Sequence, residues 1–333
     1  MSGIQKTINE TIEATNIAVN TAFNKDYQNY EPELQELAFK YNTGAVPDSK
    51  FLINMLFSSV EEWKGAQEYD RFDKLIEQVV TNKEHFVRGK DIPYRAFERA
   101  RQANSILGMD MYIKTIASLA PAAKDAPYEK MLKLLKGGAG STYGTCFDNQ
   151  PLFSTSHNFD DASGTQSNLI TGTGVTTAQI SDDLKTAMSS IMSFHYLVDT
   201  GSTEDEDKRM LNRNPRFVVL CDPSLYAKMK DVRTLENIVI DSNGGSQTNS
   251  LRNTFEVVHR IVDSANPNAY YLIDVSEANT KPFLIGMEDE GRLITPQDNI
   301  DALANLQMLR YGYNQLSFGN AYGAWWKIVK INN

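Results

Sequence analysis

The sequence is poor in cysteine and histidine. Its 333 residues include 2 cysteines and 4 histidines, with no CxxC pair and no HExxH motif. Two cysteines are too few for a disulfide framework, so we expect synthesis in a reducing cytoplasm. The two motifs that would indicate a zinc site are also missing.

A long apolar run is missing as well. No stretch is long enough to cross a bilayer, and the polar segment 1–10 does not resemble a secretory signal. We therefore expect neither a membrane protein nor a secreted one. With 41% apolar residues, the chain can still bury a substantial core and form about two domains.

Basic residues are outnumbered by acidic ones. The chain has 33 Lys and Arg against 42 Asp and Glu, which gives a net charge of -9. Binding to phosphates requires concentrated positive charge, so this balance argues against a protein that grips nucleic acid through a basic face.

Few residues suggest chemistry. Cys146 and His157 could form a thiolate–imidazole pair, and His157 with Asp160 and Asp161 could bind a metal. A turn-rich loop that satisfies its own backbone is the stronger interpretation of this segment. The glycine-rich segment 137–142 follows a helix and has no lysine after it, so it is no phosphate-binding loop. We expect no catalytic residue, no cofactor and no metal site.

The C-terminal stretch 308–331 carries the clearest pattern. Leu309, Tyr311 and Tyr313 alternate with polar or small residues, and Trp326 and Ile328 begin a second alternating run. A period of two predicts two half-buried strands, with glycine and asparagine residues supplying the turn between them.

Three segments together resemble the major head subunit of phage Mu-like viruses. They are the C-terminal stretch 308–331, the pair 60–65 and 79–86, and the helix end 134–138 that leads into 146–158. The segments occur in the family's order and cover most of the chain from Phe23 onward. The resemblance implies an α+β fold of the Hong Kong 97 (HK97) type, which is a capsid fold.

The resemblance also implies a division of the chain. Residues 1–54 would form an N-terminal arm, 55–92 an extended loop, 93–175 with 291–333 a peripheral domain containing the spine helix, and 176–290 an axial domain. The extended loop would lie over an adjacent subunit. Candidate contacts between subunits are the large aromatic residues Trp63, Tyr69, Phe72 and Phe86. An ordinary hairpin with internally packed aromatic residues is the alternative.

Several elements are predicted from local signals. The arm carries a thin stripe of Ile4, Ile8 and Ile12, which suggests a short helix held by a neighbour or by its own domain. A charged middle part of the loop, around residues 70–78, could be helical. Helices are expected over 93–136, split or kinked by two prolines, and Gly137-Gly138 should end the last one through a positive φ.

The second half of the chain reads as an α/β module. Thr176 and Gln179 form a capping box for a helix, and the strand 217–221 precedes Asp222-Pro223, which should open another helix. Further strands are expected at 255–262, 270–273 and 283–285. His259 is expected to be a buried, hydrogen-bonded residue of its strand.

The function implied by the resemblance is structural. The chain would form pentameric and hexameric capsomers that close into an icosahedral shell around double-stranded DNA, assembled in the bacterial host cytoplasm without a membrane. Scaffold, portal and other head proteins are the expected partners, and an acidic shell that only encloses DNA is compatible with the charge. Two alternatives are an encapsulin-like nanocompartment and a cytosolic hydrolase that uses Cys146 and His157.

Overall fold

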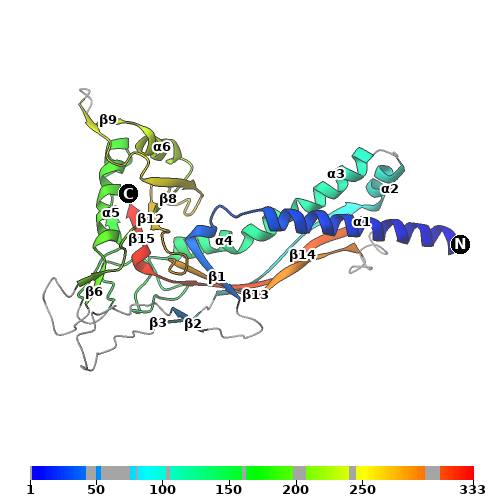
Figure 1. Cartoon of the computed structure of the whole chain (residues 1–333), viewed down its shortest axis with the longest axis horizontal. Coiled ribbons are helices and arrows are strands. Elements are labelled where there is room, and N and C mark those ends of the chain that lie inside the picture. The colour runs from blue at the N-terminus through cyan, green and yellow to red at the C-terminus, as the bar shows by residue number, and fades with distance from the viewer. Residues whose placement is uncertain are drawn as a thin grey trace, which may run out of the picture.

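The computed structural model describes residues 2–42, 50–53, 76–79, 82–102, 106–159, 163–197, 208–239, 245–296 and 308–333. These residues form two bodies, a long body and a compact unit (Figure 1). The N-terminus lies at the far end of the long body, and the C-terminus lies inside the compact unit. Among the described residues, no helix is long and apolar enough to span a membrane.

The long body is built on a four-stranded sheet in the order β1-β13-β14-β4. β1 runs parallel to β13, and the other neighbours are antiparallel. The strands are β1 (Ala38–Asn42), β4 (Asn82–Pro93), β13 (Phe283–Ile294) and β14 (Met308–Tyr322). Leu309, Tyr311 and Tyr313 are buried, which confirms the first strand predicted at the C-terminus.

The second C-terminal strand starts later than predicted. Trp325–Lys327 form a short 3-10 turn, η4, and β15 (Ile328–Asn332) follows it. Lys327 lies between Trp326 and Ile328, and all three are fully buried, so the half-buried alternation predicted for this run was wrong. The ion pair of Lys327 with Asp274 is the reason that a lysine is tolerated there.

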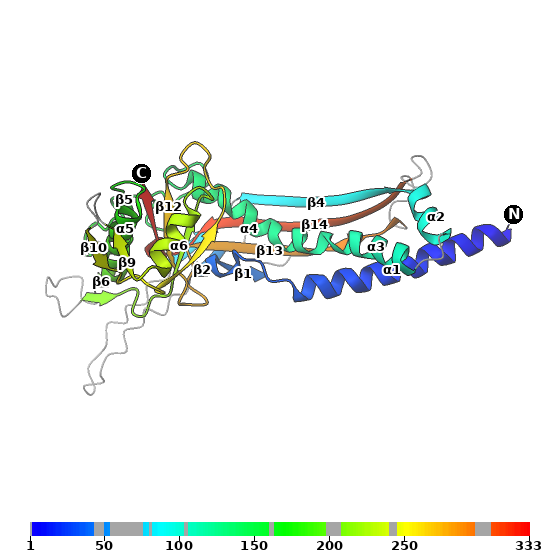
Figure 2. The same cartoon turned by 90° about the horizontal axis from the view of Figure 1, so that it is seen from above.

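Helices lie along one face of the long sheet (Figure 2). They are α1 (Ser2–Asn29), α2 (Tyr94–Gln102), α3 (Ile106–Ala117) and α4 (Leu119–Gly137). The helical segment is split as predicted, but the split falls at Ser118, between α3 and α4, and at neither of the two prolines. Pro121 lies in the first turn of α4, where its missing N–H costs little, and Pro127 lies inside the helix without ending it.

The N-terminal segment differs from the predicted arm with a short helix. α1 is one helix of 28 residues, and Ile12, Val19 and Phe23 are buried on one side of it. The Phe23 ring lies 5.6 Å from the ring of Tyr313 in β14. Contacts of α1 with the rest of the chain therefore stabilise a longer helix than the spacing of its isoleucines indicated.

Gly137 and Gly138 end α4 as predicted, but for another reason. Gly138 has a φ of -67°, so no left-handed conformation is needed. A Cβ on Gly138 would lie 2.8 Å from the Phe153 ring, and one on Gly137 would lie 2.5 Å from the Tyr143 ring. The glycines allow these rings to approach the helix end.

The compact unit contains a five-stranded sheet in the order β11-β8-β12-β15-β5. All residues of the two central strands β8 and β12 are buried. The strands are β5 (Leu169–Thr171), β8 (Phe217–Cys221), β11 (Phe255–His259), β12 (Tyr270–Asp274) and β15. Smaller ribbons pair β6 (His195–Leu197) with β7 (Lys208–Met210) and β9 (Asn237–Val239) with β10 (Ser246–Thr248).

Two helices belong to the compact unit. α5 (Thr177–Ser193) begins with the predicted capping box of Thr176 and Gln179. α6 (Tyr226–Thr234) begins later than predicted, because the Asp222 carboxylate and carbonyl accept hydrogen bonds from the next backbone N–H groups and form a turn. His259 is exposed and packs beside Tyr226 at 4.6 Å, so its predicted burial was wrong.

The residues at which the chain passes from one sheet to the other differ from the predicted domain boundaries. β4, assigned to the extended loop, is an edge strand of the long sheet, and β13 enters that sheet at residue 283. β5 and β15, assigned to the peripheral domain, belong to the compact sheet. β2 (Lys50–Ile53) pairs with β3 (Ile76–Val79), so the end of the segment predicted as helical is a strand.

Candidate functional site

The junction of the two bodies contains a buried ion pair and several buried hydrogen bonds. Three connections cross it: residues 138–168 from α4 to β5, 275–282 from β12 to β13, and 323–327 from β14 to β15. Backbone hydrogen bonds tie the last two together, since the Gly323 N–H donates to the Pro282 carbonyl and the Ala324 N–H donates to the Lys281 carbonyl.

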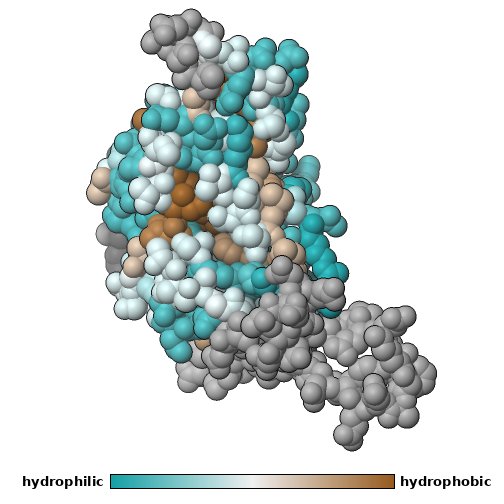
Figure 3. Space-filling model, turned by 90° about the vertical axis from the view of Figure 1, so that its left-hand side faces the viewer, coloured by the Kyte–Doolittle hydropathy of each residue, from teal (hydrophilic) through white to brown (hydrophobic). Residues whose placement is uncertain are grey.

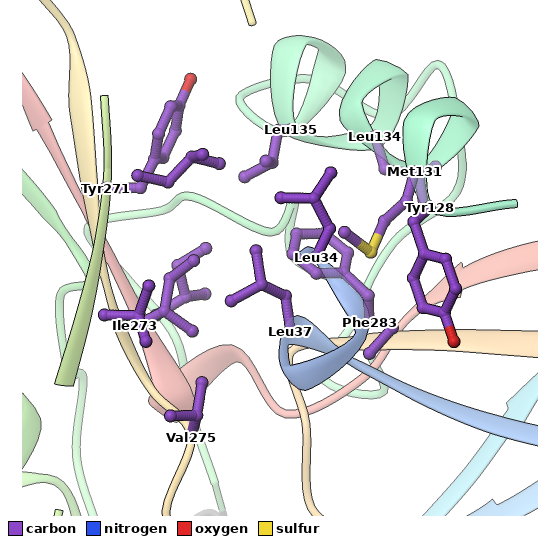
Figure 4. Packing of buried hydrophobic residues seen from close by; sticks show 14 of the residues in the cluster. Leu34, Leu37, Tyr128, Met131, Leu134, Leu135, Tyr271, Ile273, Val275 and Phe283 are labelled. Atoms are coloured by element: carbon purple, nitrogen blue, oxygen red, sulfur yellow. The ribbon is translucent and has the colours of Figure 1, made fainter. Parts of the chain in front are cut away.

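An apolar wedge fills one side of the junction. Leu34 and Leu37, on and beside the short helix η1 (Gln35–Leu37), are almost fully buried. Figure 4 shows them between α4 and the compact sheet. Their surroundings are Leu134 and Leu135 of α4, Tyr271 and Ile273 of β12, and Val275.

Two exposed ion pairs connect the segment 33–37, which contains η1, to the compact unit. Glu33 pairs with Arg260 at 2.6 Å, and Glu36 pairs with Arg216 at 2.8 Å. All four side chains are partly exposed, so solvent screens them and each pair contributes little to stability. The two pairs therefore help to position the segment 33–37 and add little to the stability of its packing.

A buried ion pair fixes η4. The Lys327 ammonium lies 2.8 Å from Asp274 and 3.2 Å from Glu277. Asp274 also accepts hydrogen bonds from the backbone N–H of Arg216 and from the N–H and hydroxyl of Ser276. These donors satisfy the carboxylate, as a buried charge requires.

An aromatic stack joins the first and third connections. The ring centroids of His157 and Trp325 lie 4.3 Å apart, and the two rings are nearly parallel, with an angle of 5° between their planes. Its Nδ1 faces the Asp148 carboxylate at 2.7 Å, and its Nε2 faces the Leu152 carbonyl at 3.1 Å. His157 is fully buried, so the ring is held on both edges and on one face.

These contacts do not form a catalytic pair. Burial raises the pKa of the Cys146 thiol well above its usual range, and the Asp148 charge raises it further. Both nitrogens of His157 already face other partners. A thiol that stays protonated and an imidazole without a free nitrogen cannot activate each other, so the hydrolase alternative loses its basis.

No metal site is found either. Among the described residues, no group of three or more His, Cys, Asp or Glu side chains could hold an ion. Asp160 and Asp161, which the sequence placed beside His157 as possible ligands, lie outside the described residues.

The predicted contact residues fall mostly outside the described part of the chain. Trp63, Tyr69 and Phe72 are not among the described residues. Phe86 lies in β4, where its backbone pairs with Leu316 of β14. Their role between subunits stays a prediction.

The compact unit exposes apolar side chains of its own. Figure 3 shows an apolar area on its outer end, surrounded by hydrophilic residues. Large apolar residues of this unit that are at least two-fifths exposed are Met192, Met210, Leu235, Val239 and Ile261. Exposed apolar area on a rigid body is typical of a surface used in association.

Comparison with known proteins decides the family. The sequence model of the family described as Mu-like prophage major head subunit gpT matches residues 12–192, more than half of the chain. The chain belongs to this family. As a major head subunit it is a viral major capsid protein, with a structural role in a multimeric shell.

Solved structures similar to this major head subunit include capsid proteins, and the first one below supports the HK97-type capsid fold. A chain from the procapsid of bacteriophage JBD30 is 15% identical, with a TM-score of 0.50, over 97% of this chain and 75% of that one. The capsid of cyanophage P-SCSP1u gives 12% identity and a TM-score of 0.49 over 91% and 88% of the two chains. A virus-like particle from Pyrococcus furiosus gives 10% and 0.45 over 94% and 98%. No curated protein matches the sequence.

The major head subunit's junction was missed by sequence reasoning. Two buried asparagines of the junction, Asn168 and Asn212, donate hydrogen bonds to carbonyls of η4. Both lie in polar connecting segments, where asparagine is common and its role cannot be recognised from the sequence. Lys327 did carry a signal, because it interrupts the apolar run Ala324–Val329. A lysine within such a run indicates a buried ion pair, but it does not identify the partner.

Proposed function

We propose that the chain forms pentameric and hexameric capsomers that close into an icosahedral shell around double-stranded DNA. Membership of the major head subunit family carries this proposal. The two-body shape supports it, because a compact unit joined at a defined angle to a long body can pack as a wedge around a symmetry axis (Figure 1). In this proposal the compact unit is the axial domain and the long body is the peripheral domain.

Contacts between copies come from two kinds of surface. The exposed apolar residues of the compact unit bury against a neighbour within a capsomer. The predicted extended loop 55–92, with Trp63, Tyr69, Phe72 and Phe86, reaches across neighbours, whereas α1, η1 and β1 of segment 1–54 pack on their own chain. Each contact can be weak, because a closed shell multiplies many of them.

DNA is enclosed rather than gripped. The net charge of -9 disfavours strong phosphate binding, so affinity for DNA is low and sensitive to salt. Scaffold, portal and other head proteins guide closure, and assembly takes place in the cytoplasm of a bacterial host. The chain performs no catalysis of its own.

Assembly can be tested directly. The chain is expressed alone and with its neighbouring genes, and the products are examined by negative-stain electron microscopy and light scattering. Closed shells, rings or tubes of megadalton mass are the expected result. A monodisperse monomer or dimer under both conditions would contradict the proposal, and shells that enclose protein cargo instead of DNA would favour a nanocompartment.

A further inference from the structure

Asn168 links two of the connections that cross the junction. Its amide Nδ2 donates to the Leu152 carbonyl at 2.6 Å and to the Trp325 carbonyl at 3.1 Å. Its Oδ1 accepts from the Ser154 N–H at 3.0 Å, and the side chain is fully buried. One side chain therefore holds η4 against the loop that follows α4.

Asn212 makes a similar pair of donations to the next carbonyl of η4 and to α5. Its Nδ2 donates to the Ile191 carbonyl at 2.8 Å, near the end of α5, and to the Trp326 carbonyl at 2.9 Å. Only 3% of Asn212 is exposed. Two successive carbonyls of η4 are thus each held by a buried amide.

Polar groups are an unexpected choice for this position. Burying an amide costs free energy that its hydrogen bonds only offset, so an apolar residue could hold the bodies together at least as well. Apolar contact is non-directional, so an interface made only of leucine and tryptophan would specify the angle between the two bodies less sharply. Hydrogen bonds are directional and select one geometry.

We propose that Asn168 and Asn212 act as a lock that sets the angle between the compact unit and the long body, and thereby the size of the shell. The buried Lys327–Asp274 pair completes the lock by holding η4 to the end of β12. This inference rests on the proposed function, since a subunit angle determines shell size only if the chain builds closed shells. The lock specifies shape more than it adds stability.

Substitution by aspartate is the sharpest test of each amide. Asn168→Asp and Asn212→Asp keep the size of the side chain but replace the amide donor with a carboxylate oxygen. That oxygen then faces two carbonyl oxygens, which it repels, so each variant pushes η4 away from its partner.

The chain contains a matched control. Asn249 donates from Nδ2 to the carbonyls of Val232 and Leu235, at 2.5 and 2.8 Å, and accepts from the Leu251 N–H at 2.9 Å. It is also buried, at 6% exposure, but all its partners lie within the compact unit. Asn249→Asp therefore causes the same chemical damage away from the junction.

Shell diameters are measured by electron microscopy for the wild type and the three variants. We expect Asn168→Asp and Asn212→Asp to broaden the distribution of diameters about twofold or more, while Asn249→Asp keeps the wild-type width at a similar loss in Tm. Junction variants with wild-type width, or equal broadening by Asn249→Asp, would overturn the lock.

A second measurement requires no variant. Hydrogen exchange of unassembled wild-type protein should show the Gly323 and Ala324 amides protected as strongly as those of β8. Fast exchange at these amides would show that the junction is a flexible hinge, and this would contradict the proposed lock. If the wild type forms no shells at all, the proposed function fails instead, and the exchange experiment still decides whether the junction is rigid.

Discussion

Lys327 and Asp274 form an ion pair of 2.8 Å between two side chains that are both fully buried. Lys327 lies in η4 and Asp274 ends β12, so the pair connects the chain entering the last strand with the centre of the compact sheet. Isolated, either charge would be costly in this environment.

Removing one partner should therefore destabilise the protein strongly. Lys327→Met leaves a buried carboxylate without its cation, and we expect the free energy of unfolding to fall by about 3–5 kcal/mol. Lys327→Met combined with Asp274→Asn should lose less than the sum of the single variants. Urea unfolding measures each value.

An exposed ion pair provides the comparison. Lys40 and Glu290 lie 2.6 Å apart with both side chains partly exposed, so Lys40→Met should cost less than about 1 kcal/mol. Equal losses for Lys40→Met and Lys327→Met would show that burial does not govern these pairs.

Gly323 should tolerate no side chain. A Cβ at this position would lie 2.3 Å from the Lys281 carbonyl oxygen, which is backbone and cannot rotate away. We expect Gly323→Ala to lower the free energy of unfolding by about 1–3 kcal/mol, measured by urea unfolding. At Gly140 the nearest atom would be 3.8 Å away, so Gly140→Ala should change it by no more than about 1 kcal/mol.

Local signals in the sequence predicted local structure well. The capping box of Thr176, the strand 217–221 and the alternation around Tyr311 were found because each depends on residues close in sequence. The long helix α1 was not, because its stability depends on Phe23 meeting Tyr313, nearly 300 residues away. Membership of β15 in the compact sheet is also a long-range fact.

The junction was harder to predict for a related reason. Asn168 is the partner of Trp325, and Asn212 is the partner of Trp326, through backbone carbonyls that any residue would present. Sequence alone cannot show which carbonyl a buried amide will meet. Only Lys327 departed visibly from its surroundings.

Alkaline pH should weaken the fold through Cys221. Burial raises the pKa of its thiol from 9.0 to about 12, with a smaller effect of the Asp222 charge. Below pH 9 the thiol is protonated in both states and stability is unaffected. Above pH 9 only the unfolded state loses this proton, so Cys221 lowers the free energy of unfolding as pH rises towards 12, by at most about 1.4 kcal/mol per pH unit for this one thiol. The buried Cys146 thiol, whose pKa is also raised, adds a fall of its own.

Urea unfolding at several pH values between 8 and about 9.5 tests this slope, in a range where tyrosine, with an ordinary pKa of about 10, is still mostly protonated. Cys221→Ala removes the thiol and should give a shallower slope than the wild type. Identical slopes would show that this thiol does not contribute.

In the folded protein, both Cys146 and Cys221 should also resist a thiol reagent until denaturant is added, since both are buried.

The docking of α1 on its own chain can be separated from the rest of the fold. Phe23 is almost fully buried between α1 and β14, with its ring 5.9 Å from Tyr27 and 5.6 Å from Tyr313. Truncating such a residue costs about 3–5 kcal/mol. Because α1 packs on α3, α4 and β14 of the long body, Phe23→Ala should release this helix before the compact unit unfolds.

Hydrogen exchange distinguishes local release from global unfolding. In Phe23→Ala, amides of α1 should exchange much faster, while those of β8 and β12 keep their wild-type rates. Ile17→Ala is the control, because Ile17 lies on the same helix but is 63% exposed, and its truncation should leave α1 protected. Faster exchange throughout the compact unit would show that α1 is an integral part of one cooperative fold. Unchanged exchange in α1 would mean that its contacts with β14 contribute nothing to holding it in place.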